Sequence, residues 1–397
     1  MIELATVIAA PSAAAVLCDL GCDVIKVEEP TGDTWRHTEG GAGPVIDRQP
    51  VGFTQQNRGK RGIVLNLRTA RGLQLMRELL SSADIFLTNV RSRALEKMGL
   101  DFPTISVLFP RLIFAHLSAW GSAGPKVDDP GYDFGPFWAG SGLMDYVRPF
   151  ADSPMPRFPG GIGDNTTAMQ LVAGIGLALY HRERTGRGQL VDTALFRSGM
   201  WCMSQPLIQA SHGIERFTSA GRKLEADSER ATLLASGSFL CADGVWLMML
   251  GLETARHFPR VVDALGIAPM SLEEWKANIV ANTRRADEIF LTKTSDEWSD
   301  IFREKDVWFT PVRKSEDMMT DEQAISSGAS VEAPGVPFRL VANPIKLSEG
   351  GPNMPCGPAP RLGQHSEEVL SQDLGLTPSE INALRAAGIT NAAETDV

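Results

Sequence analysis

The sequence contains little cysteine and histidine for its length. Its 397 residues include only 5 Cys and 6 His. The cysteines form no CxxC pair, which argues against a disulfide scaffold and a zinc site, and the histidines show no metal-ligand spacing. Scattered, unpaired cysteines are typical of proteins from reducing compartments, so we expect a cytoplasmic protein that binds no metal.

Motifs that identify common enzyme classes are also missing. There is no GxGxxG after a strand, no GxxxxGK[ST] loop, no GxSxG and no HExxH. Dinucleotide, ATP, serine-hydrolase and metallopeptidase interpretations therefore lose their main support, and we expect no permanently bound cofactor. No apolar run is long enough to span a membrane, and the N-terminus lacks the basic region of a signal peptide.

Basic residues are the minority charge. Asp and Glu number 48 against 38 Lys and Arg, which gives a formal net charge of −10 and argues against nucleic acid as a partner. Two stretches are nevertheless basic, Asn57–Arg68 (NRGKRGIVLNLR) and Asn89–Gly99 (NVRSRALEKMG). Such clusters often form a solvated face, but Arg and Lys also bind ligands that carry several phosphates. Both interpretations stay open at this point.

The first third of the chain alternates between short apolar runs and helical patterns. Strands are expected within residues 1–9, 22–30, 61–68, 84–90 and 110–120, and helices within 11–21 and 69–83. This alternation predicts βαβ units and an α/β fold with a large, open, mostly parallel, Rossmann-like sheet. Ligands of such sheets bind beyond the carboxyl ends of the strands, which here carry Glu28, Asn89 and Ser118.

A change in the sequence pattern near residue 215, toward more highly charged helical segments, predicts a second, smaller domain. Charged helical patterns there, including residues 271–293, surround one hairpin that turns at Asp243 and Gly244. We expect a large α/β domain at 1–200, a linker at 201–220 and a small α+β domain at 221–325. Residues 326–397 are expected to form a linker and helices that return to the large domain.

One carboxylate lies at the start of a long apolar helix. In PGGIGDNTTAMQL, Asp164 follows Gly160, Gly161 and Gly163. A carboxylate there can cap the helix by accepting its first N–H groups. It can equally act as a covalent nucleophile toward an activated acyl group, with the glycines leaving room for the acyl group and backbone N–H groups stabilising an oxyanion.

The segment before Asp164, residues 121–163, is rich in Gly, Pro and Asp and is expected to be irregular. Long irregular segments in compact proteins are more often functional than idle. Within it, DPGYDFG places Tyr132 beside Asp133. This polar pair can line a pocket or form a surface turn, and the sequence pattern fits both.

These stretches together resemble the class III CoA-transferase family, which comprises formyl-CoA:oxalate and carnitine-type CoA-transferases and the α-methylacyl-CoA racemases. The matching pieces span nearly the whole chain and run in the order LGCDVIKVEEPTGD, NRGKRGIVLNL, ADIFLTNVR, PRLIFAHLSAWGSAGP, PGYD, GDNTTAM, RTGRGQLVD and PAPRLGQHSEEVL. The resemblance implies a large open α/β domain, linkers and a small domain, with two subunits interlocked as a homodimer.

The resemblance also implies the roles of particular residues. The nucleophilic aspartate of the family falls on Asp164, and a pocket tyrosine with its acidic neighbour falls on Tyr132 and Asp133. The implied partners are an acyl-CoA donor and a carboxylic acid acceptor, and the implied reaction passes through an aspartyl anhydride and an aspartyl-CoA thioester. The segments implied to contact CoA contain Leu65, Asn66, Arg68, Asn89, Val90, Arg91, Lys97 and Met98.

Three other functions remain as alternatives. Racemases of the family have a histidine where this chain has Tyr132, and tyrosine is a poor base near neutral pH, so a racemase-type isomerase is second to a transferase. A non-catalytic acyl-CoA-binding protein and an NAD-type oxidoreductase are weaker. Two departures from the oxalate-using members, Ile8 in place of a glutamine and no glycine run in residues 220–237, argue against oxalate. The aromatic residues Phe134, Phe137 and Trp138 close to Tyr132 point to an apolar or aromatic acid instead.

Overall fold

The structure is a computed structural model that describes the chain except for residues 38–42, 149–152, 215–229 and 392–397. Two compact units are present and are described separately. The first contains Met1–Asp145, Arg157–Ser204 and Met319–Val397, and the second contains Tyr146–Pro156 and Gln205–Met318. The boundary expected at residue 221 lies outside the described residues, and the other expected boundaries stay predictions.

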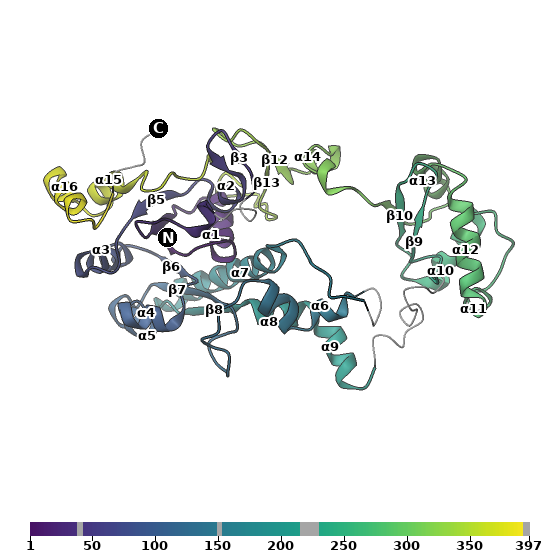
Figure 1. Cartoon of the computed structure of the whole chain (residues 1–397), viewed down its shortest axis with the longest axis horizontal. Helices are drawn as coiled ribbons and strands as arrows, with labels where there is room; N and C mark the ends of the chain where they lie inside the picture. The colour runs from purple at the N-terminus through teal and green to yellow at the C-terminus, as the bar shows by residue number, and fades with distance from the viewer. Residues whose placement is uncertain (38–42, 149–152, 215–229, 392–397) are drawn as a thin grey trace. The chain divides into compact units, whose positions relative to one another are not determined.

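A six-stranded parallel sheet forms the centre of the first unit (Figure 1). Its strand order is β5-β2-β1-β6-β7-β8, and every neighbouring pair is parallel. This confirms the predicted α/β class. The strands are β1 (Ile2–Leu4), β2 (Ile25–Glu28), β5 (Arg61–Val64), β6 (Ile85–Thr88), β7 (Ile113–Ser118) and β8 (Leu190–Ala194).

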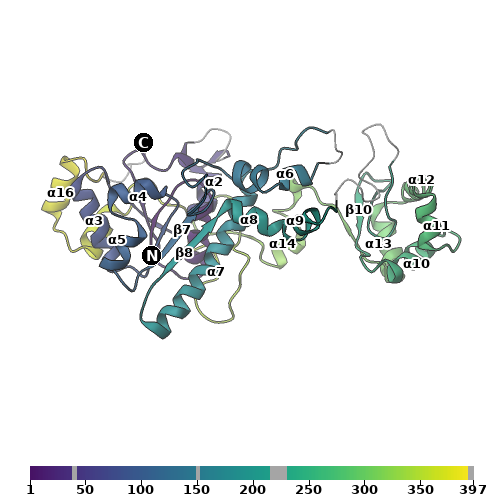
Figure 2. The same ribbon diagram turned by 90° about the horizontal axis from the view of Figure 1, so that it is seen from below.

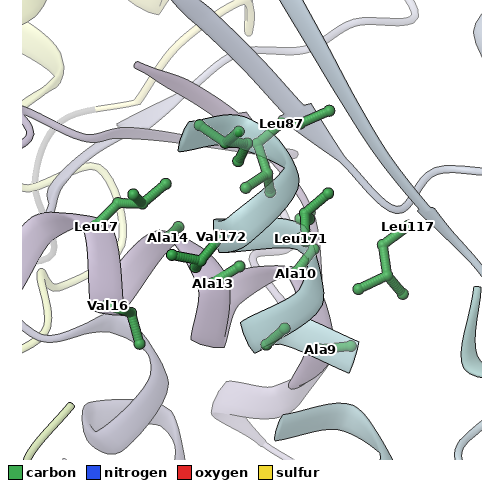
Figure 3. Close-up of a cluster of buried hydrophobic side chains, with 14 of the residues drawn as sticks. Ala9, Ala10, Ala13, Ala14, Val16, Leu17, Leu87, Leu117, Leu171 and Val172 are labelled. Carbon is green, nitrogen blue, oxygen red and sulfur yellow. The ribbon is translucent and has the colours of Figure 1, made fainter. Parts of the chain in front are cut away.

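Helices α1 (Ala9–Asp19) and α7 (Ile162–Thr185) cover one face of this sheet. The small side chains of α1 allow α7 to approach closely, and Figure 3 shows Ala9, Ala10 and Ala13 of α1 beside Leu171 and Val172 of α7. Helix α7 ends at Gly186, which caps it at a φ of 74°, and its last turn carries basic side chains that suit the negative end of the helix dipole. In Figure 2, α7 runs alongside β7 and β8.

The opposite face of the sheet is covered by helices from both ends of the chain. These are α3 (Ala70–Ser81), α4 (Ser92–Met98), α5 (Phe102–Leu108) and α16 (Pro378–Ala386), which share one apolar core with β5 and β6. The remaining helical and strand segments of the first unit are η1 (Thr34–Arg36), β3 (Val45–Ile46), β4 (Gln49–Pro50), α2 (Val51–Asn57), α8 (Leu195–Cys202), α14 (Glu322–Ser326), β12 (Ser330–Val331), β13 (Leu340–Val341), α15 (Ser366–Glu368) and η5 (Val369–Asp373).

The C-terminal part of the chain lies along the outer edge of β5. The Gly62 N–H donates to His365 Nδ1 at 3.0 Å, and the His365 N–H donates back to the Gly62 carbonyl at 2.8 Å. The Val64 N–H donates to Ser366 Oγ at 3.2 Å. Residues three hundred positions away in the sequence therefore take up hydrogen bonds that a further strand would otherwise make.

The segment expected to be irregular between residues 121 and 163 is partly helical. A π-helix, η2, runs over Phe134–Gly140, and a short helix, α6, over Leu143–Tyr146. Phe137 and Trp138 of η2 are buried and belong to the core beneath α1 and α7. The sequence pattern missed η2 because its glycines and proline disfavour a helix, whereas the buried side chains of Phe137 and Trp138 stabilise it by tertiary packing.

The second unit contains a three-stranded antiparallel sheet, β11-β10-β9, with helices packed on it. The predicted hairpin is confirmed by the pairing of β9 with β10. The single helical pattern over residues 271–293 is instead two helices, because Asn278 leaves the helical conformation and Asn282 Nδ2 donates to the Trp275 carbonyl at 3.1 Å. The elements assigned to this unit are α9 (Ser204–Ser211), β9 (Ser238–Leu240), β10 (Trp246–Met249), α10 (Thr254–Ala264), α11 (Leu272–Ala277), α12 (Ile279–Phe290), α13 (Ser295–Glu304), β11 (Phe309–Pro311) and η4 (Ser315–Asp317).

Across the described ranges, every helix is too short or too polar to cross a bilayer.

Candidate active site

Asp164 lies in the first turn of α7 but does not cap it. The cap position is Gly161, whose φ of 91° suits glycine, and no side chain at that position bonds the helix. Asp133 performs the capping from another segment, because its Oδ2 accepts the N–H groups of Gly161 at 3.0 Å and Gly163 at 3.3 Å. The interpretation of Asp164 as a helix cap is therefore wrong, and its carboxylate is left for another role.

The glycine at position 163 serves packing rather than access. A Cβ on Gly163 would come within 2.5 Å of Phe137 Cγ, so the ring of Phe137 occupies the space that we expected an acyl group to use. The N–H groups of Gly161 and Gly163 already bond Asp133. This corrects the expectation that these glycines expose free N–H donors to an oxyanion.

The two carboxylates are both displaced from their ordinary titration range. Burial, and to a smaller degree the neighbouring charge of Asp133, raises the pKa of Asp164 to about 7. Burial also raises the pKa of Asp133, although the N–H groups of Gly161 and Gly163 oppose this shift. Among the residues that the structure describes, no lysine or arginine forms an ion pair with Asp164. A buried carboxylate without a cation is costly, and such groups gather at functional sites.

Asp164 lines two cavities. The first, of about 630 Å³, is bounded by the turn from Thr6 to Ala9, by Asn89 and Arg91 after β6, and by the end of β7. The second, of about 790 Å³, contains the charged residues Asp164, Asp133 and Arg157 together with a largely apolar wall. That wall is formed by Ile8, Trp35, Phe134, Phe158 and Pro159. The first cavity therefore joins the carboxyl end of the sheet, where such folds bind ligands, to Asp164.

Some of the expected site residues lie in these cavities. Asn89 and Arg91 share the first cavity with Asp164, and Tyr132, which is 72% exposed, lines both cavities. Of the three strand-end residues, Asn89 and Ser118 line the first cavity. Glu28 does not, because it is buried and paired with Arg36 at 2.7 Å.

The other expected CoA contacts lie outside both cavities. Leu65 is fully buried in the core, and Asn66 donates its N–H to the Ile389 carbonyl at 2.8 Å. Arg68 has an 83% exposed side chain and pairs with Glu29 at 3.4 Å. The remaining three are Val90, which is half-buried after β6, and Lys97 and Met98 in the last turn of α4. Their expected contact with CoA stays a prediction.

His116 also lines the first cavity, although the spacing of the histidines gave no reason to select it. Its side chain is 8% exposed at the end of β7, and its Nε2 lies 3.0 Å from the Val90 carbonyl oxygen. Burial lowers the pKa of His116, so the ring is neutral at neutral pH. Its place near the carboxyl end of a predicted parallel strand was the one available signal.

A cluster of buried charges lies on the α1 face of β1 and β2. Lys26 Nζ is 3.0 Å from Glu3 Oε1 and 3.0 Å from Asp33 Oδ2, and Lys60 Nζ is 2.6 Å from Glu3 Oε2. All four side chains are fully or almost fully buried. The sequence reasoning missed this cluster, because charged residues that alternate with apolar ones along IEL and IKVE normally indicate a solvent-facing side of a strand.

Comparison with known proteins adds the family. The profile described as CoA-transferase family III matches residues 1–366. The chain is 32% identical to cinnamoyl-CoA:phenyllactate CoA-transferase of Clostridium sporogenes, covering 97% of this chain and 94% of that one. It is 31% identical to (R)-2-hydroxy-4-methylpentanoate CoA-transferase of Clostridioides difficile, covering 96% of each. A CAIB/BAIF family protein from Brucella suis has a similar structure, with a TM-score of 0.75 and 27% identity over 94% of this chain and 97% of that chain.

The family match extends over more than nine-tenths of the sequence. It agrees with the structure, which has a parallel six-stranded sheet and a cavity at the carboxyl edge of that sheet. This chain belongs to CoA-transferase family III.

Proposed function

We propose that the protein transfers CoA from an acyl-CoA thioester to a free carboxylic acid, with Asp164 as the covalent nucleophile. The observation that carries this proposal is the position of Asp164, a buried carboxylate that pairs with no cation of the described residues and lines two cavities. The family supports CoA transfer in general. The covalent route is supported by the geometry, because a carboxylate with few polar partners is weakly solvated and reactive toward a thioester.

The reaction runs in four balanced displacements. An oxygen of Asp164 attacks the thioester carbonyl, the C–S bond breaks, and CoA thiolate leaves an acyl-aspartyl anhydride. The thiolate then attacks the Asp164 carboxyl carbon, releasing the donor acid and forming an aspartyl-CoA thioester. The acceptor carboxylate attacks the same carbon and expels the thiolate. Attack of the thiolate on the acceptor's carbonyl gives the new acyl-CoA and regenerates Asp164, so the thioester energy is conserved without ATP.

The two cavities suit the two parts of the substrate. The first carries Arg91 and Asn89, which are suited to the polar arm of CoA. The second has aromatic walls, including Phe158, whose ring stacks on Trp138 with centroids 3.9 Å apart. An apolar or aromatic carboxylic acid fits this second cavity. The names of two relatives, which refer to cinnamoyl and phenyllactate groups and to 2-hydroxy-4-methylpentanoate, point in the same direction.

Racemisation is less well supported by the same residues. A racemase needs a base at the α-carbon, and Tyr132 is exposed while Asp133 Oδ2 is engaged by two backbone N–H groups.

We also expect the protein to act as a homodimer in the cytoplasm, as the family resemblance and the cysteine content suggest.

Trapping the covalent intermediate tests the proposal. The protein is incubated with a panel of apolar and aromatic acyl-CoAs and treated with hydroxylamine or borohydride, and the peptide containing Asp164 is analysed by mass spectrometry. We expect a hydroxamate or a reduced side chain at Asp164 and none in Asp164→Asn. Acyl exchange in the wild type without any modification at Asp164 would contradict the covalent route, and α-proton exchange into deuterated water without acyl exchange would favour a racemase.

A further inference from the structure

The turn between β1 and α1 holds an unfavourable backbone conformation beside Asp164. Val7 has a φ of 70°, in the left-handed region. Of the five described non-glycine residues with positive φ, Val7 is the one with a β-branched side chain, for which this region is most strained. Val7 and Ile8 line both cavities together with Asp164. Strain of this kind persists only where surrounding groups enforce it.

Three side chains from other segments hold consecutive backbone groups of this turn. Lys26 Nζ donates to the Ala5 carbonyl at 2.8 Å. The Asn89 amide bonds both backbone groups of Thr6, accepting the N–H at 3.1 Å and donating to the carbonyl at 2.8 Å. Asp33 Oδ1 accepts the Val7 N–H at 3.1 Å. Hydrogen bonds from three side chains thus fix the path of the backbone from residue 5 to residue 7.

Asp33 is itself fixed by buried charges. Its Oδ2 lies 3.0 Å from Lys26 Nζ, and Lys26 is paired in turn with Glu3 at 3.0 Å. Asp33 also accepts the Trp35 N–H at 2.9 Å, and Trp35 forms part of the wall of the second cavity. One carboxylate therefore orients the backbone at Val7 and at Trp35, which both line the second cavity.

We propose that Asp33, held by Lys26, is a positioning residue that fixes the Thr6–Ile8 turn as a rigid wall of the cavities that Asp164 lines. This inference rests on the transferase function proposed above. It assigns to the buried charges a role in catalysis in addition to folding: they keep the acyl carbonyl at a set place relative to Asp164, which makes the attacking geometry reproducible. Removing the bonds that Asp33 makes to the turn should lower turnover more than it weakens the binding of acyl-CoA.

Asp33→Ala and Asp33→Asn test this role in the full-length protein. Asp33→Ala removes the acceptors for both Val7 and Trp35, whereas Asp33→Asn keeps Oδ1 as an acceptor and loses the charge. We expect kcat of Asp33→Ala to fall about 10-fold or more while KM for acyl-CoA changes less than about 3-fold. Asp33→Asn should recover only part of kcat, because it keeps an acceptor for the turn but loses the pair with Lys26 that holds residue 33 in place.

Asp19→Asn is the matched control, because Asp19 is another buried acid, paired with Arg58 at 2.6 Å, and lines neither of the two cavities with Asp164. It should lower thermal stability to an extent similar to Asp33→Asn while kcat per folded molecule stays within about 2-fold. Equal losses of kcat in Asp19→Asn and Asp33→Ala would show that general destabilisation, and not positioning, is responsible.

Val7→Gly keeps the test decisive if Asp33→Ala fails to fold. Glycine adopts positive φ without strain, so this variant should fold and resist urea at least as well as wild type, yet kcat should fall about 5-fold because the turn loses its rigidity. A stable and fully active Val7→Gly enzyme would overturn the inference.

The wild-type protein is assayed first. Absence of acyl exchange in the wild type contradicts both the proposed function and this inference. An active wild type with an unaffected Asp33→Ala variant contradicts the inference alone.

Discussion

Two buried carboxylates of the same unit have opposite electrostatic surroundings. Glu3 lies between Lys26 and Lys60, and although burial alone would raise its pKa, the two cations outweigh burial and lower it. Asp164 has no such cation among the described residues, and burial raises its pKa to about 7. The first carboxylate is fixed in its charged form by its neighbours. The second gains little from the fold, so its charge is available for chemistry.

This difference shows how one unit separates stability from reactivity. A buried acid with cations is costly to disturb but chemically inert, while a buried acid without them is destabilising and reactive. The two sites are linked through Asp33, which pairs with Lys26 and bonds the turn beside Asp164.

Replacing Asp164 by asparagine should abolish transfer. The amide is a poor nucleophile and forms no anhydride, so we expect turnover to fall by about 10⁴-fold or more, as when a covalent nucleophile is removed from other enzymes. Acyl exchange between a labelled acid and its CoA thioester measures this loss. Glu183→Gln is the matched control, because Glu183 is an exposed acid on the same helix and should be dispensable. Retention of more than about a tenth of wild-type turnover in Asp164→Asn would contradict the role of Asp164.

Replacing Glu3 by glutamine should instead lower the free energy of unfolding by a large amount. Lys60 would lose its paired carboxylate and Lys26 one of two, and breaking a buried ion pair from one side typically costs about 3–5 kcal/mol. Urea unfolding at pH 7 measures the change. Arg303→Gln, which breaks an exposed pair with Asp300, should cost well under about 1 kcal/mol. An unchanged urea midpoint for Glu3→Gln would show that the cluster does not stabilise the fold.

The pH dependence of stability should differ in sign between the two acids. The pKa of Asp164 rises from an ordinary 3.8 to about 7, so the folded state binds its proton more tightly and stability falls as pH rises through this window. The free energy of unfolding of Asp164→Asn should therefore exceed that of wild type increasingly between pH 4 and pH 7, by on the order of 2–4 kcal/mol, and level off above. The stabilisation from Glu3 runs the other way, since it is present above an ordinary pKa of 4.5 and is lost as pH falls through the lowered value. A flat difference between Asp164→Asn and wild type would contradict the burial of an unpaired carboxylate.

The smallest effect concerns two exposed arginines from the two basic stretches. Arg91 lines the first cavity, whereas Arg68 pairs with Glu29 and lines neither cavity that contains Asp164. We expect Arg91→Ala to raise KM for acyl-CoA about 5- to 10-fold through the loss of one charge-assisted contact, with kcat little changed. Steady-state kinetics measures both constants. Arg68→Ala, the matched control, should change KM less than about 2-fold, and a larger effect there would show that the CoA arm extends beyond the cavity toward β5.

The order of strands and helices could be predicted because it depends on local patterns. Short apolar runs identified β5 and β6, and a long apolar helical pattern after the glycines identified α7. Asp164 could be singled out because a carboxylate after three glycines at a helix start is a local feature as well. None of these inferences requires knowledge of what lies opposite in space.

The details of the site could not be predicted because they depend on distant partners. Asp133 caps a helix that begins 29 positions later, and Gly163 is required by the ring of Phe137. Lys26 looks like a surface residue until Glu3 and Asp33 are placed beside it. Each of these facts joins segments whose approach is set by the sheet order, which the sequence pattern alone does not determine.

The cover over the outer edge of β5 has a consequence for biosynthesis. His365 and Ser366, which bond Gly62 and Val64, are synthesised about 300 residues after the strand that they cover. Until then the nascent sheet presents unpaired N–H and carbonyl groups that can recruit a strand from another molecule. Premature termination between the end of β8 and residue 365 should therefore yield chains that aggregate through this edge, even though all six strands and the helix bearing Asp164 have already been synthesised.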